Sequence, residues 1–167
     1  MVLVFSPITT RDGDKDTLRN VSPPAEGGIG EFVVNVAVEE YLQQMAACAE
    51  TLPYGESELD MVGLTAATSK VVRPPRLAES PVSFECRTLQ IVRTNPGQHM
   101  SANIVIGEVV HLWLRDDIVD DAWHIDQDAL HTLGRMGGPS YVRTRDRIDF
   151  VRGRQALTTP LPWADDE

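Results

Sequence analysis

The sequence predicts a mainly β domain of the α+β class, with a barrel-like antiparallel sheet and a few short helices. Three observations support this prediction. The chain has 167 residues, of which 42% are hydrophobic and 24% charged, as is typical of one globular domain with a buried core. Runs of β-branched and aromatic residues recur between Gly- and Pro-containing turns. Helical spacing is confined to a few short stretches.

The start of the chain places a charged segment directly behind an apolar run. The run MVLVF predicts a strand, and SPITTRDGDKDTLRNV (6–21) follows it. One interpretation of this segment is a solvated turn, in which Asp14 or Asp16 caps a short helix. The other is an anion site, because Arg11, Lys15 and neighbouring threonine hydroxyls would lie beside a helix N-terminus. Residue chemistry alone leaves both interpretations open.

The next part of the chain alternates between strand and helix. GEFVVNVAV (30–38) is rich in β-branched residues and predicts a strand, whereas EEYLQQMAACAETL (39–52) has helical spacing. The stretch 53–69 contains proline and glycines and predicts a loop with one helical turn around 58–62.

Two long strands then predict an antiparallel hairpin. They cover 80–94 and 103–117 and are joined by the polar turn NPGQHMSA. The apolar residues of the first strand change register, which predicts a bulge. Gly107 marks a point in the second strand where the chain bends or another group approaches closely.

The C-terminal part predicts one more helix and one more strand. A short helix over 125–138 would begin at Asp126 as N-cap and stop at Gly134, and 139–152 would end with a short strand. The tail 153–167 has two prolines and an acidic end and predicts a flexible or docking arm.

Composition and motifs narrow the function. A net charge of −10 argues against a nucleic-acid partner and against binding to an anionic membrane. The sequence has no G-x-S-x-G, P-loop or H-E-x-x-H motif, and its four histidines are too scattered to predict a metal site. Cys48 and Cys86 lack ligand spacing, and no signal peptide precedes them. Two free thiols and a cytoplasmic location are therefore expected.

Three stretches, in this order, resemble the flavin reductase-like, FMN-binding split-barrel family. They are KDTLRNV…GEFVVN at 15–35, RLAESPVSFECR at 76–87, and GEVVHLWLRDDIVD with LGRMGGPSYVRTRDRIDF at 107–120 and 133–150. The resemblance implies an antiparallel split β-barrel domain over 1–152, with 153–167 as its tail. Met1 lies close to the strand that follows the family's leading segment, so either the start of the chain is truncated or the protein is a shortened relative, and an N-terminally shortened domain is expected. The resemblance also implies a homodimer with flavin sites at or near the subunit interface.

The resemblance further implies two groups of FMN-binding residues. The segment similar to SPITTRDGDKDT would hold the phosphate, with charge from Lys15, hydroxyls from Ser6 and Thr17, and a turn oriented by Asp16. The stretch similar to RMGGPSY would lie near the flavin ring, where Tyr141 could stack. The implied cofactor-binding residues are Ser6, Arg11, Lys15, Asp16, Thr17, Gly137, Gly138, Ser140 and Tyr141.

The leading hypothesis is an FMN-binding oxidoreductase of the flavin reductase type, which passes a hydride from NAD(P)H to flavin or to an acceptor. The lack of an acid–base or nucleophile motif fits it, because the cofactor carries the reactivity. An alternative is a non-catalytic, dimeric split-barrel binding protein that has lost full flavin binding. A third hypothesis, a hydrolase or isomerase built on His111, Asp116 or His124, lacks a nucleophile or orienting partner nearby in the sequence.

Overall fold

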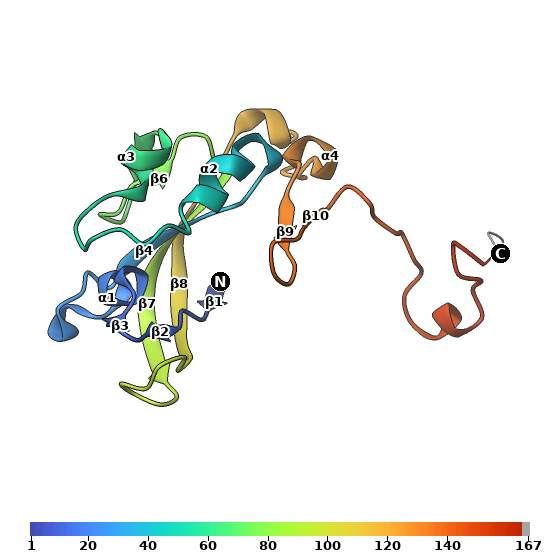
Figure 1. Cartoon of the computed structure of the whole chain (residues 1–167). Helices are drawn as coiled ribbons and strands as arrows, with labels where there is room; N and C mark the ends of the chain where they lie inside the picture. The colour runs from blue at the N-terminus through green and yellow to red at the C-terminus, as the bar shows by residue number, and fades with distance from the viewer. Residues whose placement is uncertain (165–167) are drawn as a thin grey trace.

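The computed structural model describes residues 1–164, and its centre is a four-stranded antiparallel sheet with the order β1-β8-β7-β4 (Figure 1). These strands are β1 (Val2–Phe5), β4 (Glu31–Asn35), β7 (Val82–Arg93) and β8 (Asn103–Leu114). Smaller antiparallel pairs join β2 (Thr9–Thr10) to β3 (Gly13–Asp14), β5 (Ala66–Ala67) to β6 (Arg76–Leu77), and β9 (Leu133–Arg135) to β10 (Tyr141–Arg143). The predicted mainly β, antiparallel fold is confirmed.

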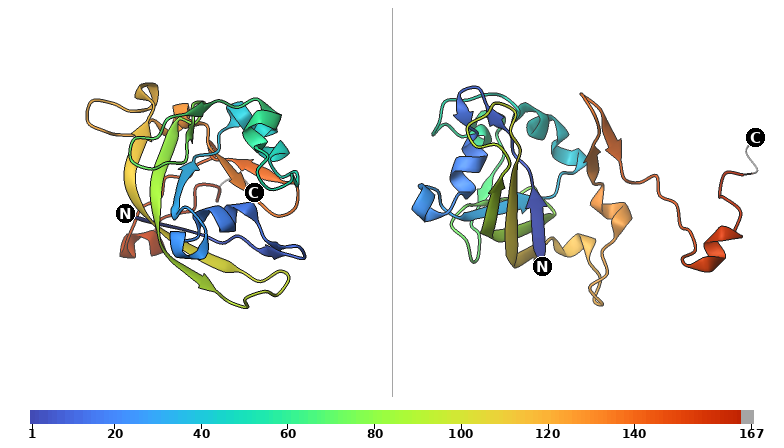
Figure 2. Two further views of the ribbon diagram at one scale, coloured as in Figure 1. Left: turned by 90° about the vertical axis from the view of Figure 1, so that its left-hand side faces the viewer. Right: turned by 90° about the horizontal axis from the view of Figure 1, so that it is seen from below.

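The helices are short and lie around the sheet (Figure 2). The α-helices are α1 (Asp16–Val21), α2 (Leu42–Ala47), α3 (Glu58–Val62) and α4 (Gln127–Leu130). The 3-10 turns are η1 (Pro24–Glu26), η2 (Glu39–Tyr41), η3 (Asp116–Ile118) and η4 (Arg154–Leu157). Within the described part of the chain, no helix has both the length and the apolar character that a membrane crossing requires.

The long β7–β8 hairpin and its bulge are confirmed. The pairing between the two strands shifts register between Glu85 and Cys86 and again between Thr88 and Gln90. Gly107 lies where another group approaches β8, as predicted, and that group is an aromatic ring. A Cβ atom at this glycine would stand 2.4 Å from Cζ of Phe32.

The core lies between α1 and the sheet. Leu18 and Val21 of α1 are buried together with Phe32 of β4, Cys86 of β7 and Val105 of β8. The ring of Phe5 meets that of Phe32 edge-on, with centroids 5.3 Å apart. Burial of these apolar side chains holds α1 against the sheet, and it thereby positions the charged segment that precedes α1.

The predicted cap of α1 is wrong. The residue that precedes the helix is Lys15, and its side chain makes no capping hydrogen bond. Asp14 instead accepts from Thr9 Oγ1 at 3.2 Å and from Arg93 Nη1 at 3.0 Å. Asp16 is the first helical residue and pairs with Arg19 at 3.6 Å. The carboxylate of Asp14, which the local spacing predicted to cap α1, is therefore bound by Arg93 of β7 instead.

The helix predicted over 125–138 has the expected start and an earlier end. Asp126 is its N-cap and accepts from the backbone of Asp128 and Ala129, as predicted. The helix stops at His131, which adopts a left-handed backbone with φ of 47°. Gly134 is not the stop. It lies inside β9, where a Cβ atom would come within 2.9 Å of Val142.

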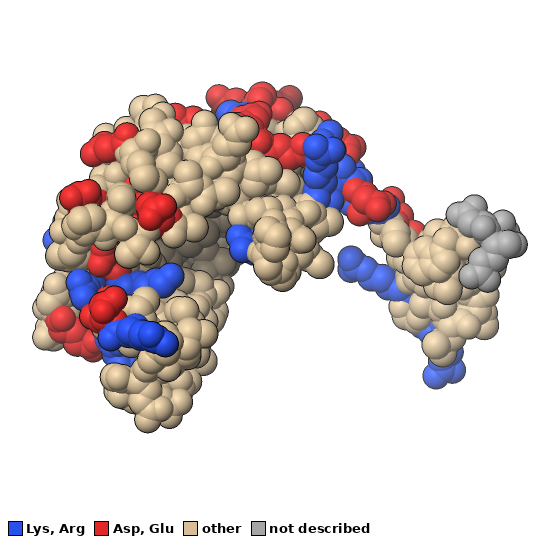
Figure 3. Space-filling view, in the orientation of Figure 1, with Lys and Arg blue, Asp and Glu red and all other residues tan. Residues whose placement is uncertain are grey.

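Beyond β10 the chain forms an arm that leaves the body of the molecule (Figure 1). Two ion pairs lie at its root: Arg145 Nη2 is 2.6 Å from Glu39 Oε1, and Arg147 Nη2 is 2.5 Å from Asp128 Oδ1. Figure 3 shows a hollow beneath the arch that joins the sheet, the β9–β10 hairpin and the arm. The boundary predicted at residue 152 falls within this arm, and the acidic end of the predicted tail lies outside the described residues.

Candidate functional site

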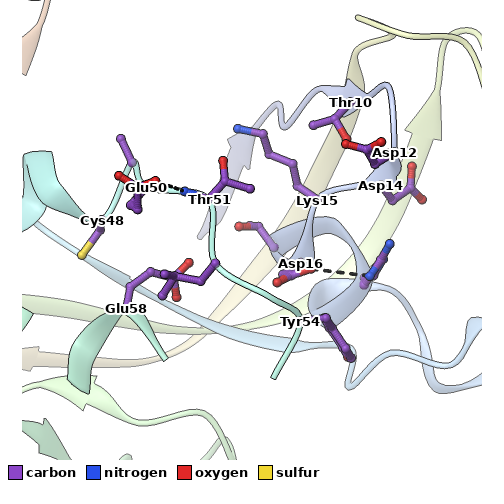
Figure 4. Close-up of a pocket in the computed structure, with 14 residues that line it drawn as sticks. Thr10, Asp12, Asp14, Lys15, Asp16, Cys48, Glu50, Thr51, Tyr54 and Glu58 are labelled. Atoms are coloured by element: carbon purple, nitrogen blue, oxygen red, sulfur yellow. Dashed lines mark hydrogen bonds and ion pairs between the residues drawn. The ribbon is translucent and has the colours of Figure 1, made fainter. Parts of the chain in front are cut away.

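The charged segment lines a cavity of ≈370 Å³, which we call the acidic cavity (Figure 4). One wall comes from β2, β3 and α1, and it includes the predicted residues Lys15, Asp16 and Thr17. The other wall comes from the stretch after α2 and the first residue of α3. It consists of Cys48, Ala49, Glu50, Thr51, Leu52, Tyr54 and Glu58. The structure therefore brings three of the predicted phosphate residues to one cavity.

Charge in the acidic cavity is strongly unbalanced. Five carboxylates line it, against two basic side chains, Lys15 and Arg19. The carboxylates come from both walls (Figure 4): they are those of Asp12, Asp14, Asp16, Glu50 and Glu58. Arg19 is already engaged, since it pairs with Asp16 and lies 5.2 Å from the ring centroid of Tyr54. Of the two basic side chains in this cavity, Arg19 forms an ion pair and Lys15 forms none with a described residue.

Cys48 in the same cavity is not an activated nucleophile. Burial raises the pKa of the Cys48 thiol, and the negative charge of Glu58 raises it further. The thiol is therefore protonated at neutral pH, and only the thiolate is strongly nucleophilic. The second cysteine, Cys86, is buried in the core, where burial raises its pKa to about 11.

A second cavity of ≈400 Å³, which we call the arginine cavity, shares Thr10 and Asp14 with the first. Its lining consists of Thr9, Thr10, Arg11, Gly13, Asp14, Arg93, Pro96, Gly97 and Asn103. Here two guanidinium groups face one carboxylate, that of Asp14. The predicted residue Arg11 thus lies in a different cavity from Lys15.

Arg93, the last residue of β7, binds three other segments of the chain. Its guanidinium donates to Asp14 Oδ2 at 3.0 Å, to Glu26 Oε2 at 3.3 Å and to Ser22 Oγ at 3.5 Å. These contacts link β7 to β3, to the end of α1 and to η1. Arg93 therefore fixes the position of the β2–β3 hairpin that both cavities share.

The remaining predicted residues lie elsewhere. Gly137, Gly138, Ser140 and Tyr141 belong to the β9–β10 hairpin, and they line neither cavity. The hairpin is attached to the segment that follows β4: Leu133 N donates to Ala37 O at 3.0 Å. Figure 1 shows it apart from α1, across the body of the molecule. One chain therefore does not bring the two predicted halves of the flavin site together.

Two further contacts concern the predicted aromatic residue and Ser6. Arg135 Nη1 donates to the Tyr141 hydroxyl at 2.7 Å, and its guanidinium lies 4.8 Å from the ring centroid. One face of the ring predicted to stack on flavin is thus occupied by a cation of the same chain. Ser6 is exposed between β1 and β2 and lines neither cavity.

The residues of the hydrolase or isomerase hypothesis are dispersed. His111 of β8 pairs across the strands with Glu85, Asp116 opens η3, and the His124 ring lies 3.1 Å from Asp120. Within residues 1–164, no hydrogen bond joins these three candidates to one another or to a nucleophile. The structure adds no support to that hypothesis.

Comparison with known proteins decides the family. Residues 15–136 match the family model described as the flavin reductase like domain, which is well over half of the chain. This chain belongs to the flavin reductase-like family. The family suggested by the ordered motifs is thereby confirmed.

Relatives of this flavin reductase-like chain are found in several bacteria. An uncharacterized protein of Deinococcus radiodurans is 36% identical over 155 residues, which cover 90% of this chain and 64% of the relative. An uncharacterized protein of Aquifex aeolicus is 35% identical over 144 residues, which cover 85% of this chain and 68% of the relative. The chain thus spans about two thirds of the length of these relatives.

Solved structures show the same architecture. Nitrilotriacetate monooxygenase component B from Bacillus cereus aligns with a TM-score of 0.79 at 25% identity, covering 89% of this chain and 71% of that one. A 2-nitrobenzoate 2-nitroreductase from Pseudomonas fluorescens aligns with a TM-score of 0.75 at 27% identity, covering 92% and 70%. A split-barrel-domain protein from Shewanella frigidimarina, 19% identical, has a TM-score of 0.72 and covers 90% and 71%. The predicted split barrel is confirmed.

Sequence reasoning missed half of each cavity of this flavin reductase-like domain. Arg93 lies 79 residues from the carboxylate of Asp14 that it binds, and no local pattern links the two. The carboxylates of Glu50 and Glu58 face α1 from a stretch that the sequence predicts to be helix end and loop. The one available signal was charge: these acidic residues occur in a chain with an excess of ten carboxylates.

Proposed function

We propose that this chain binds FMN and acts as an oxidoreductase of the flavin reductase type. The family match over 15–136 carries the proposal, because it includes α1 and the opposite wall of the acidic cavity, and Arg93 of the arginine cavity. Two similar structures are named as a monooxygenase component and a nitroreductase, and a third, from Shewanella baltica, as an FMN-binding domain. Their names agree with flavin chemistry.

The donor set of this region fits FMN. A phosphate needs cations and N–H donors, and Arg11, Arg93 and Lys15 surround the β2–β3 hairpin. A ribityl chain needs partners for its hydroxyls, and the Thr17 hydroxyl and the Asp16 carboxylate provide them. Bound FMN would supply the hydride chemistry, with NAD(P)H as the proposed donor. The residues of this chain would bind the cofactor and orient it. Because the raised pKa of Cys48 keeps its thiol protonated, the acidic cavity contains no thiolate that could react in place of the flavin.

We also propose that the working unit is a homodimer. Gly137, Gly138, Ser140 and Tyr141 lie on a hairpin away from α1, so a flavin held at α1 does not meet them within one chain. A second copy, related by a twofold axis, would present its hairpin to the α1 face of the first. A cytoplasmic location stays a prediction.

The deciding experiment is a titration of the purified protein with FMN. We expect quenched flavin fluorescence with a stoichiometry of one FMN per chain, and FMN-dependent oxidation of NADH or NADPH followed at the nicotinamide absorbance band. Binding without turnover would favour the non-catalytic split-barrel protein. A protein that leaves FMN fluorescence unchanged would contradict the proposal.

A further inference from the structure

A third cavity lies at the free edge of β4, and we call it the proline cavity. Its volume of ≈540 Å³ exceeds those of the acidic and arginine cavities, and it falls within the range of small-molecule sites, about 300–1,000 Å³. Most of its lining is apolar: Val21, Ile29, Phe32, Val33, Pro74 and Pro75. A ligand in this cavity must therefore be mainly apolar, because its polar groups would lose water without finding partners there.

The backbone of β4 presents polar groups to this cavity. Just before the strand, Gly30 O accepts from Thr88 N at 2.9 Å, and just after it Val36 N donates to Val82 O at 3.0 Å. Alternate residues of an antiparallel strand bond to the same neighbour, so the N–H and C=O of Val33 point away from β7. Among the described residues, neither group of Val33 has a backbone partner on that side. Both are therefore available to a ligand.

The loop beside this edge keeps the cavity open. Arg73 N donates to Glu31 Oε2 at 3.0 Å, and Leu77 N donates to Asn35 Oδ1 at 3.0 Å, so the loop is fixed to β4 at two points. The two prolines lie between these points, and they have no N–H with which to pair with the strand. They form a rigid apolar wall instead. The cavity is thus preformed by the loop and does not depend on a mobile segment.

One guanidinium at this cavity has an unused donor. Arg73 Nε donates to Glu31 Oε2 at 3.1 Å, and its Nη2 donates to Ile29 O at 2.9 Å. Within residues 1–164, Nη1 of this arginine makes no hydrogen bond. Glu31 also pairs with Arg87 Nε at 3.7 Å, so two arginines face one carboxylate and leave an excess of one positive charge. In a chain of net charge −10, this excess favours an anionic group.

We propose that the proline cavity binds a planar aromatic carboxylate, with the ring among the apolar residues and the carboxylate at Arg73 Nη1. A flat ring suits a gap between a strand edge and a proline wall, and a guanidinium binds carboxylates through directed N–H groups. The N–H and C=O of Val33 add the few polar contacts that orient such a ligand. This site goes beyond flavin binding. Among the described residues, only Thr17 lines both this cavity and the acidic cavity.

The first experiment is isothermal titration calorimetry with 2-naphthoate and with its neutral analogue 2-naphthamide. The parent should bind the carboxylate about tenfold more tightly than the amide, as for one charge-assisted hydrogen bond to a largely exposed arginine. Arg73→Gln should weaken naphthoate binding about tenfold and leave naphthamide binding unchanged. Arg87→Gln is the matched control, because Arg87 pairs with the same glutamate but does not line the cavity. It should retain the preference for the carboxylate.

Naphthamide also reports on the integrity of the cavity in each variant, because its binding does not use the charge. A parent that binds neither probe, or that binds both equally, would overturn the proposal. An equal loss of both probes in Arg73→Gln would overturn it as well. So would a loss of preference in Arg87→Gln as large as that in Arg73→Gln.

The second experiment repeats the naphthoate titration in the presence of excess FMN. The affinity for naphthoate should be the same with and without FMN, because the residues proposed to bind the phosphate and ribityl chain line the other two cavities, apart from the shared Thr17. Full displacement of naphthoate by FMN would place the probe in the flavin site and overturn the proposal. If the parent does not bind FMN, the proposed function fails, and the dependence on Arg73 still decides the proline cavity.

Discussion

At the residue scale, one buried carboxylate organises a loop beside the sheet. Glu85 of β7 is almost fully buried, and its oxygens accept from the backbone N–H groups of Lys70, Val71 and Val72 at 2.7, 2.6 and 3.2 Å. Burial alone raises the pKa of Glu85, but these donors and the nearby His111 outweigh it and hold the pKa below its ordinary value of 4.5. The ionised form is therefore the one that the fold requires.

Glu85→Gln should lower the free energy of unfolding by about 2 kcal/mol, because the amide offers one acceptor oxygen to the three backbone donors that the carboxylate binds. Urea denaturation at pH 7 measures this, with the exposed Glu108→Gln of β8 as control. A depressed pKa contributes stability that is present above the unfolded-state pKa and lost as pH falls through the folded-state value. The parent should therefore lose more stability than Glu85→Gln below about pH 4.5, the ordinary value for this group. Equal acid sensitivity of the two proteins would contradict this account.

At the scale of elements, β7 and β8 form the centre of the sheet. Phe32 of β4 can pack over β8 because the residue beneath its ring, Gly107, has no side chain. The Phe32 ring packs directly over Gly107, where a Cβ atom would lie 2.4 Å from the ring. The ring also meets Phe5 of β1 edge-on, so it cannot move without disturbing both edges of the sheet.

Gly107→Ala should therefore destabilise the domain by about 1–3 kcal/mol through overpacking. The matched control is Gly137→Ala in the β9–β10 hairpin, where a Cβ atom meets nothing within 4 Å and φ is not positive. Chemical denaturation of the two variants should give a large loss for the first and a negligible change for the second. Similar losses in both would mean that the contact with Phe32 relaxes freely.

At the scale of the whole molecule, the C-terminal arm leaves large apolar side chains in solvent. Leu157 is 86% exposed, Ile148 57% and Trp163 51%, far from the core that α1 and the sheet enclose. The stretch 141–154 contains five arginines and two aspartates in a chain of net charge −10. An apolar, basic arm is suited to cover an acidic neighbour, and the proposed homodimer provides one.

We expect the double variant Leu157→Asp, Trp163→Asp to shift the protein from dimer to monomer in light scattering coupled to size-exclusion chromatography. Each aspartate would bury an unpaired charge in the interface. Met61→Asp, at an exposed apolar position on α3, is the control and should remain dimeric. A dimer that tolerates both arm substitutions would exclude the arm from the interface, and a monomeric parent would contradict the dimer itself.

Much of the fold was predictable because the patterns that specify it are local. β-Branched and aromatic residues predicted β4, alternating apolar residues predicted β7 and its hairpin with β8, and the shift of register within β7 predicted the bulge. Asp126 was identifiable as an N-cap because it bonds to residues two and three positions away. The end of this helix at His131 could not be predicted, because Gly134, where the sequence placed the stop, lies in β9 against Val142 of β10.

The sequence by itself determined the family, the antiparallel hairpin and the identity of the charged segment at 6–21. Only the tertiary structure decided how that segment is divided, with Lys15 facing carboxylates from another stretch and Arg11 sharing a cavity with Arg93. The physical reason is range. Periodicity and capping act over a few residues, whereas the charge around a ligand is set by side chains that the sheet brings together from distant parts of the chain.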